Sequence, residues 1–260
     1  MILPDYSSTL EGGSWDAYHR ISPGGTSIDE LEEMSAAQAT LEIAHTQAIA
    51  KESAAGWLES EHGVTKHSLA WPIGIRLSDQ YYTSLSEISG REMPPMLEDA
   101  RARLVDSYID SHKYVAGKTA AIFGEPDLVI SLAAFLSEIG IRPVICATGS
   151  KLKQFSELLA SEVEGGIQDV EVLSGADHAK LAAKARELKP DLLFGASKGY
   201  PLARELNIPL IRVGFPIHDR IGGQRQLTVG YAGTQELFDR TVNALLEAKQ
   251  DYSETGYSYL

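Results

Sequence analysis

From residue 119 onward, short apolar runs alternate with amphipathic stretches of helical length, and this alternation restricts the fold more than any other feature. The first repeat is an apolar run at 119–123, followed by Pro126, which suits the first turn of a helix, and by Gly140, which suits its end. Strands that alternate with helices of this length pair in parallel through helical crossovers. We therefore expect an α/β fold with a Rossmann-like parallel sheet.

The same pattern predicts the individual elements. The expected strands are 119–123, 143–147, 169–173, 191–195 and 208–213. The expected helices are 126–139, 151–163, 177–188, 200–206 and 234–249.

The part of the chain before residue 117 contains fewer strand signals. Ser27 and Glu30 predict a capping box that opens a short helix, and apolar runs follow near 40–44 and 68–73. A long helix is expected from Pro95, with Gly117 at its end. We therefore expect a partial α/β domain with an N-terminal loop (1–92), a connecting helix (93–116), and a complete Rossmann-like domain with a C-terminal helix and tail (117–260).

Charge and hydropathy exclude two classes of partner. The chain has 23 Lys and Arg against 36 Asp and Glu, a net charge of −13, which disfavours binding to nucleic acid. It contains no run of about 18 apolar residues, so no membrane span is expected. Its first residues lack the basic and apolar segments of a signal peptide, so we expect a cytoplasmic protein.

The chain has one cysteine, Cys146, which lies on an expected strand. This count limits the metal sites and disulfides that the chain can form. One thiol cannot form an intrachain disulfide, and an iron–sulfur cluster typically takes about four cysteine ligands. The seven histidines stand at no spacing typical of a metal site. We expect no metal site and no cofactor on this chain alone.

A basic, glycine-rich segment near the end of this acidic chain, residues 212–235, is called here the basic island. It holds Arg212, Arg220 and Arg225, and it follows the last expected strand. Ligands of open parallel sheets bind at the carboxyl ends of the strands, where this segment would lie. Asp219 could pair with an arginine and pin the loop, or the arginines could contact an anionic ligand or a partner chain. The glycines before Thr234 would also open a helix N-terminus, which favours anions.

A GxSxG motif at 195–199 matches the nucleophile elbow of serine hydrolases. Such a serine needs a base and an orienting acid, but His218 is the only histidine after Ser197, and Asp219 is poorly placed to orient it. A hydrolase using Ser197 is therefore an alternative, beside a tight strand-to-helix turn, and no catalytic residue is assigned. The residues expected in a crevice or interface are Gly195, Ser197, Lys198, Gly199, Phe215, Pro216, His218, Asp219, Arg220, Gln224 and Arg225.

The stretch from Pro209 to Arg220, followed by Gln224-Arg225, Gly230-Tyr231 and Gly233, resembles the nitrogenase component 1 family. The resemblance is greatest to its β-type chains, those of the molybdenum–iron protein and of the cofactor-assembly scaffold NifN. Further matches occur in order along nearly the whole chain: Leu3-Pro4-Asp5, Gly24-Gly25-Thr26, 86–90, 103–106, Ser111-His112, Gly117-Lys118, 124–127 and Lys189-Pro190-Asp191.

The resemblance implies a subunit or fragment of a nitrogenase-type oxidoreductase for nitrogen fixation, or of its iron–molybdenum cofactor assembly scaffold. In that family the island helps to build subunit contacts around buried metal clusters. Family chains are about twice as long, and the half that is lacking here carries the cluster cysteines, to which Cys146 does not correspond. An iron–sulfur or iron–molybdenum-type cluster is then expected only in a complex with other chains.

The implied partners are an α-type component 1 chain and the reductase iron protein. A small-ligand-binding α/β domain is the other alternative.

Overall fold

The structure is a computed structural model that describes residues 2, 13–14, 16–20, 24–48, 53–251 and 253. The Leu3-Pro4-Asp5 motif and nearly all of the expected C-terminal tail lie outside these residues. The chain forms two compact units, Met1–Glu42 with Lys51–His67, and Ile43–Ala50 with Ser68–Leu260. The expected division of the chain at residues 92 and 117 stays a prediction.

The smaller unit contains short helices and a two-stranded sheet. Its elements are α2 (Ile28–Glu33), η1 (Met34–Ala36), β1 (Ala39–Ile43), α4 (Ala54–His62) and β2 (Thr65–Leu69). The expected capping box is confirmed, because the Ser27 hydroxyl accepts from the Glu30 amide at 3.2 Å and Glu30 Oε2 accepts from the Ser27 amide at 2.8 Å. An ion pair of 2.9 Å between Lys66 and Glu42 links β2 to β1.

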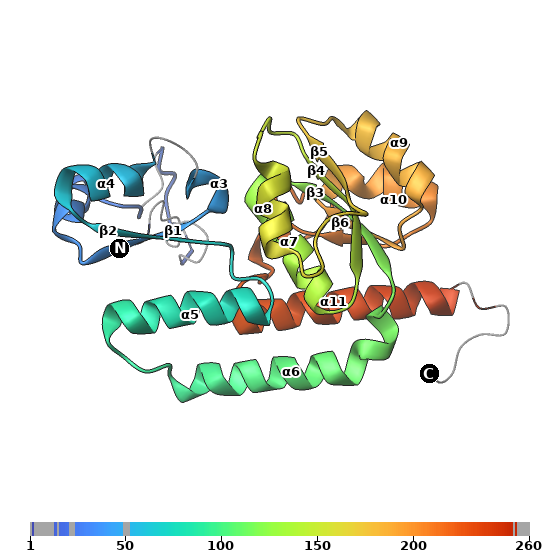
Figure 1. The fold of residues 1–260 in the computed structure, drawn as a ribbon, viewed down its shortest axis with the longest axis horizontal. Helices are drawn as coiled ribbons and strands as arrows, with labels where there is room; N and C mark the ends of the chain where they lie inside the picture. Colours follow the sequence, from blue (N-terminus) through green and yellow to red (C-terminus); the bar gives the residue numbers. More distant parts are fainter. Residues whose placement is uncertain are drawn as a thin grey trace. The chain divides into compact units, whose positions relative to one another are not determined.

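The larger unit is built on a five-stranded sheet in the order β5-β4-β3-β6-β7 (Figure 1). The strands are β3 (Thr119–Gly124), β4 (Arg142–Thr148), β5 (Glu171–Ser174), β6 (Leu192–Gly195) and β7 (Leu210–Arg212). Every neighbouring pair is parallel, which confirms the expected α/β class. The strand order reverses at β3, because β4 and β5 lie on one side of it and β6 and β7 lie on the other. In doubly wound sheets, ligands bind in the crevice at such a point.

From β3 onward, helices alternate with the strands as the sequence pattern predicts, and further helices precede β3. The helices of this unit are α3 (His45–Ala48), α5 (Ile75–Ser89), α6 (Pro95–Val115), α7 (Pro126–Glu138), α8 (Phe155–Glu162), α9 (His178–Leu188), η2 (Ser197–Gly199), α10 (Tyr200–Leu206), η3 (Gly223–Arg225) and α11 (Gly230–Asp251).

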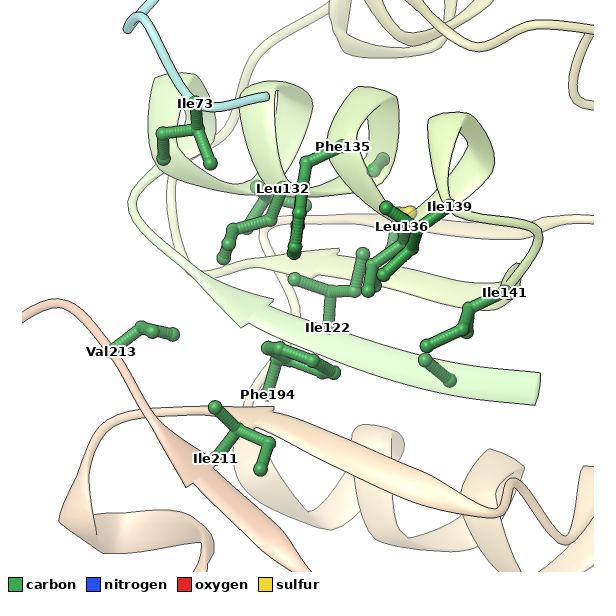
Figure 2. Packing of buried hydrophobic residues seen from close by; sticks show 14 of the residues in the cluster. Ile73, Ile122, Leu132, Phe135, Leu136, Ile139, Ile141, Phe194, Ile211 and Val213 are labelled. Atoms are coloured by element: carbon green, nitrogen blue, oxygen red, sulfur yellow. The ribbon is translucent and has the colours of Figure 1, made fainter. Parts of the chain in front are cut away.

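Successive strand residues point to opposite faces of the sheet and create two apolar layers. Ile122, Phe194 and Ile211 belong to the layer that contains Leu132 and Phe135 of α7 (Figure 2). The other face is apolar as well, because Ala121, Phe123 and Leu193 pack with side chains of α9 and α10. Burial on both faces explains why these strands are almost uniformly apolar in sequence.

Helices α5, α6 and α11 are joined by a polar contact around Asp79. Its carboxylate accepts from Arg101 Nε at 2.9 Å and Nη2 at 2.8 Å, and from the Tyr231 hydroxyl at 2.7 Å. Burial, followed by the hydrogen bond to Asp79, raises the pKa of Tyr231 above its usual range. This contact fixes the start of α11, which begins at Gly230 rather than at the expected 234.

Other elements also differ from expectation: β5 spans 171–174 rather than 169–173, and β7 spans 210–212 rather than 208–213. Helix α8 begins at Phe155 rather than at 151, because both main-chain polar groups of Leu152 are bonded to the Ser174 hydroxyl at the end of β5. Helix α5 was not expected at all; the residue that precedes it, Gly74, has no side chain that could cap it.

Candidate functional site

A crevice of about 340 Å³ lies at the carboxyl edge of the sheet, lined by residues that follow each of the strands; it is called here the carboxyl-edge crevice. Its lining residues are Phe123, Gly124, Glu125, Ala147, Thr148, Gly149, Ala176, Asp177, His178, Leu181, Ala196, Lys198, Phe215 and Pro216. Of the residues expected at the site, Lys198, Phe215 and Pro216 line it. The other expected residues are not among those that line it.

The glycines of the GxSxG motif are explained by packing. A Cβ atom on Gly195 would lie 2.2 Å from Phe123 Cε1, and one on Gly199 would lie 2.8 Å from the same atom. Both distances are far shorter than a carbon–carbon contact of about 3.5–4.0 Å. The Phe123 ring therefore accounts for both glycines without any catalytic role.

The hydroxyl of Ser197 is held in a structural hydrogen-bond network. Ser197 is 5% exposed; its Oγ donates to Asp219 Oδ1 at 2.5 Å and accepts from the main-chain amide of His218 at 3.1 Å. The contact to His218 is thus made by the backbone, and the carboxylate that faces the serine is already paired with a cation. Nothing in this geometry supports the serine hydrolase alternative.

The cation that pairs with Asp219 is Arg212, at the end of β7. Arg212 Nε lies 2.8 Å from Oδ1 and Nη2 lies 2.6 Å from Oδ2, and the Arg212 side chain is only 11% exposed. Hydrogen bonds from Arg212 and then from Ser197 hold the pKa of Asp219 well below its usual range. The internal pair expected in the island is therefore present, and its arginine is Arg212.

A second arginine fixes Arg212 from the opposite side. Arg240 Nη1, on α11, donates to the main-chain oxygen of Arg212 at 3.1 Å and to Gln226 Oε1 at 2.8 Å. Burial lowers the pKa of Arg240 below its usual range. The network runs from α11 through β7 and the island to η2, so the island is anchored to the domain at several points.

The remaining arginines of the island face outward. The Arg220 side chain is 55% exposed, and its Nη1 lies 3.7 Å from Asp219 Oδ2 and 2.6 Å from the main-chain oxygen of Asp219. Arg225 is exposed and lies over Gly222, where an added Cβ would be 2.9 Å from Arg225 Nη2. His218 is also exposed. The main chain of Gln224 belongs to η3, and its side chain lies outside the described part of the structure.

Apolar side chains stand exposed beside these arginines, and the sequence reasoning missed most of them. Phe215 is 79% exposed, Ile221 98%, Leu227 57% and Val229 46%. A sequence signal existed, since these large apolar residues occur within a segment rich in glycine and charge. Together with Arg220 and Arg225 they form what is called here the island surface.

The start of the last helix, where an anion site was expected, makes contacts within the protein instead of standing open. Gly230, Tyr231, Gly233 and Thr234 are buried. The Gly230 amide donates to the main-chain oxygen of Pro72 at 2.7 Å, and the Thr234 hydroxyl accepts from the Gly74 amide at 3.0 Å. The helix N-terminus is thus packed against the chain that leads into α5.

The donor set of the chain does not fit an iron–sulfur cluster. Cys146 is fully buried in β4, and burial raises the pKa of its thiol to about 12. A cluster requires several accessible thiolates, whereas this thiol is sealed among apolar side chains. Within the described ranges, no group of three or more His, Cys, Asp or Glu side chains is placed to hold a metal ion.

None of the described helices is both long enough and apolar enough to cross a membrane.

Comparison with known proteins places these observations in context. Residues 7–246 match the profile of the family described as nitrogenase component 1 type oxidoreductase. The chain is 34% identical over 248 residues to the nitrogenase molybdenum-iron protein beta chain of Clostridium pasteurianum, covering 95% of this chain and 54% of that protein. It is 32% identical over 250 residues to the nitrogenase iron-molybdenum cofactor biosynthesis protein NifN of Bradyrhizobium diazoefficiens, covering 96% and 50%.

A solved structure, nitrogenase Cp1 at pH 6.5, is similar with a TM-score of 0.91 and 31% identity, covering 98% of this chain and 56% of that one. The chain thus spans about half the length of the relatives that it matches.

Proposed function

The chain belongs to the nitrogenase component 1 type oxidoreductase family, and we propose that it works as a β-type subunit, or a part of one, in a larger assembly and carries no complete catalytic site of its own. That assembly is either a nitrogenase-type oxidoreductase or the scaffold on which its iron–molybdenum cofactor is built. Relatives of both kinds match almost the whole chain at similar identity, 34% and 32%. We place the assembly in the cytoplasm.

The island surface carries this proposal. Four large apolar side chains are exposed between 46% and 98% on one short segment, which also carries two outward-facing arginines. Aromatic residues and arginines are enriched at protein interfaces, and exposed apolar groups beside polar ones mark such surfaces. The network from Arg240 to Ser197 holds the segment in place, so little ordering is required when a partner binds.

The proposed partner is an α-type component 1 chain. The reductase iron protein is a further proposed partner of the completed assembly. Metal clusters would be held by those other chains, since the single buried thiol of this chain does not fit a cluster. This chain's own contribution is the surface contact.

Co-expression of the full chain with α-type chains of both kinds, followed by affinity purification and size-exclusion chromatography with light scattering, tests the proposal. We expect Ile221→Ser and Arg225→Ala each to reduce the recovered complex at least tenfold without changing the melting temperature. Leu188→Ser on α9 and Arg142→Ala at the start of β4 are matched controls, because Leu188 is 41% exposed and Arg142 is exposed. Recovery of normal complex with both island variants would show that the island is only structural.

A further inference from the structure

The carboxyl-edge crevice is a second candidate site, which shares only Phe215 with the island surface. Its volume of about 340 Å³ lies within the range of about 300–1,000 Å³ that is typical of small-ligand pockets. It also lies where the strand order reverses, which is the usual ligand position in doubly wound sheets. Position and size therefore point to a ligand, and the lining residues determine its class.

The charges at the crevice oppose a phosphate ligand. In dinucleotide-binding sheets the phosphate is held by uncapped amides at a helix N-terminus. Here one such amide in each of two helices is already bonded, because the Glu125 carboxylate accepts from the Leu128 amide at 3.1 Å and the Asp177 carboxylate accepts from the Lys180 amide at 2.9 Å. A phosphate bound at the start of α7 or α9 would thus lie close to a negatively charged carboxylate.

The charge balance favours a cation instead. Glu125 and Asp177 carry two negative charges against one positive charge on Lys198, which leaves an excess of one negative charge apart from His178. Burial raises the pKa of Glu125, and an adjacent cation would compensate for that burial. The crevice is therefore suited to a ligand that carries a positive charge.

The walls of the crevice are apolar and aromatic. The Phe215 ring is 79% exposed, and Phe123 makes an edge contact with His178 at 5.2 Å between ring centroids. Aromatic faces attract cations as well as apolar groups. We propose that the carboxyl-edge crevice binds a small organic amine with an aromatic or apolar body, and that it does not bind phosphate compounds.

Titration calorimetry on the full chain tests this inference with three probes: 2-phenylethylamine, 3-phenylpropionate and inorganic phosphate. The first two share a body and differ in the sign of their charge. We expect the amine to bind at least tenfold more tightly than either anion. Equal or tighter binding of an anion, or no detectable binding of the amine at millimolar concentration, would overturn the proposal.

Variants at the capping acids locate the site. Glu125→Gln and Asp177→Asn remove one charge each but keep an oxygen that can cap the helix, so the fold should be retained. We expect each to weaken amine binding at least fivefold, while Glu157→Gln, which removes an exposed first-turn acid of α8 away from the crevice, leaves it unchanged. Unchanged amine binding in both capping variants would refute the proposal that the amine binds in the carboxyl-edge crevice. Complex formation with α-type chains is a separate readout, so either proposal can fail alone.

Discussion

The side-chain carboxylate of Glu138 accepts a hydrogen bond from the main-chain amide of Ile75 at 2.7 Å, and its second oxygen accepts from the next amide, Arg76, at 2.9 Å. Glu138 is the last residue of α7, and Ile75 is the first residue of α5. The N-terminus of α5 is thus capped by a side chain 63 residues away. An acidic group there also meets the positive end of the helix dipole.

Glu138→Ala should therefore destabilise the fold. The substitution leaves two amides of α5 without acceptors, and loss of a helix cap costs about 0.5–2 kcal/mol. We expect the free energy of unfolding in urea to fall by about 1–2 kcal/mol. Glu247→Ala, which removes an exposed glutamate of α11, is the control and should change it by less than about 0.5 kcal/mol. Equal effects of the two variants would contradict the capping role.

We expect the ion pair of Asp219 with Arg212, and not that with Arg220, to stabilise the basic island. Arg212→Ala leaves Asp219 without its close partner, and removing one partner of a buried pair costs about 3–5 kcal/mol. Because Asp219 is 27% exposed, we expect a smaller loss of about 2 kcal/mol. Arg220→Ala should cost less than about 1 kcal/mol, as for other exposed pairs. Thermal and urea unfolding of both variants decide the matter, and a larger loss for Arg220→Ala would refute the assignment.

The same pair predicts a pH dependence. The pKa of Asp219 is lower in the folded chain than its ordinary value of about 3.9. A carboxyl group with a lowered folded pKa adds stability above the ordinary pKa and loses it as the pH falls toward the folded value. The stability difference between the unaltered chain and Asp219→Asn should thus be constant from about pH 7 to 5 and shrink below about pH 4. Urea unfolding at each pH measures it, and a difference that grows in acid would oppose the assignment.

Gly195→Ala should be poorly tolerated because its new methyl group overlaps the Phe123 ring. We expect a loss of about 1–3 kcal/mol, the usual cost of overpacking a core. Gly149→Ala is the matched control, since its added Cβ would meet nothing closer than 3.9 Å. Adding Phe123→Leu to Gly195→Ala should cost less than the sum of the single changes. Strict additivity in urea unfolding would show that the ring is not the cause.

The sequence predicts those parts of the fold that depend on local pattern. Helix α7 was expected because Pro126 and Gly140 mark its ends and its apolar residues are continuous, and the resemblance to the family is confirmed over residues 7–246. Helix α5 was missed because its cap is supplied by Glu138, far away in sequence. No local signal reports such a contact.

The candidate site shows the same limit. Residues 195–199 and 212–225 were expected at one edge of the sheet, and Lys198, Phe215 and Pro216 do line a crevice there. The sequence did not indicate that Arg212 rather than Arg220 pairs with Asp219, because only the folded geometry separates the two arginines. An arginine at the end of an apolar strand was the available signal, since a buried cation requires a partner.

The enclosure of Cys146 in β4 has a practical consequence. It is the only cysteine of the chain, it is fully buried, and burial raises its thiol pKa to about 12. A chromogenic thiol reagent would thus react with molecules whose central sheet has opened, and hardly at all with closed ones. The rate of colour development would therefore measure how often the central sheet opens in the unaltered chain. A slower rate after complex formation would show how far a bound partner reduces that opening.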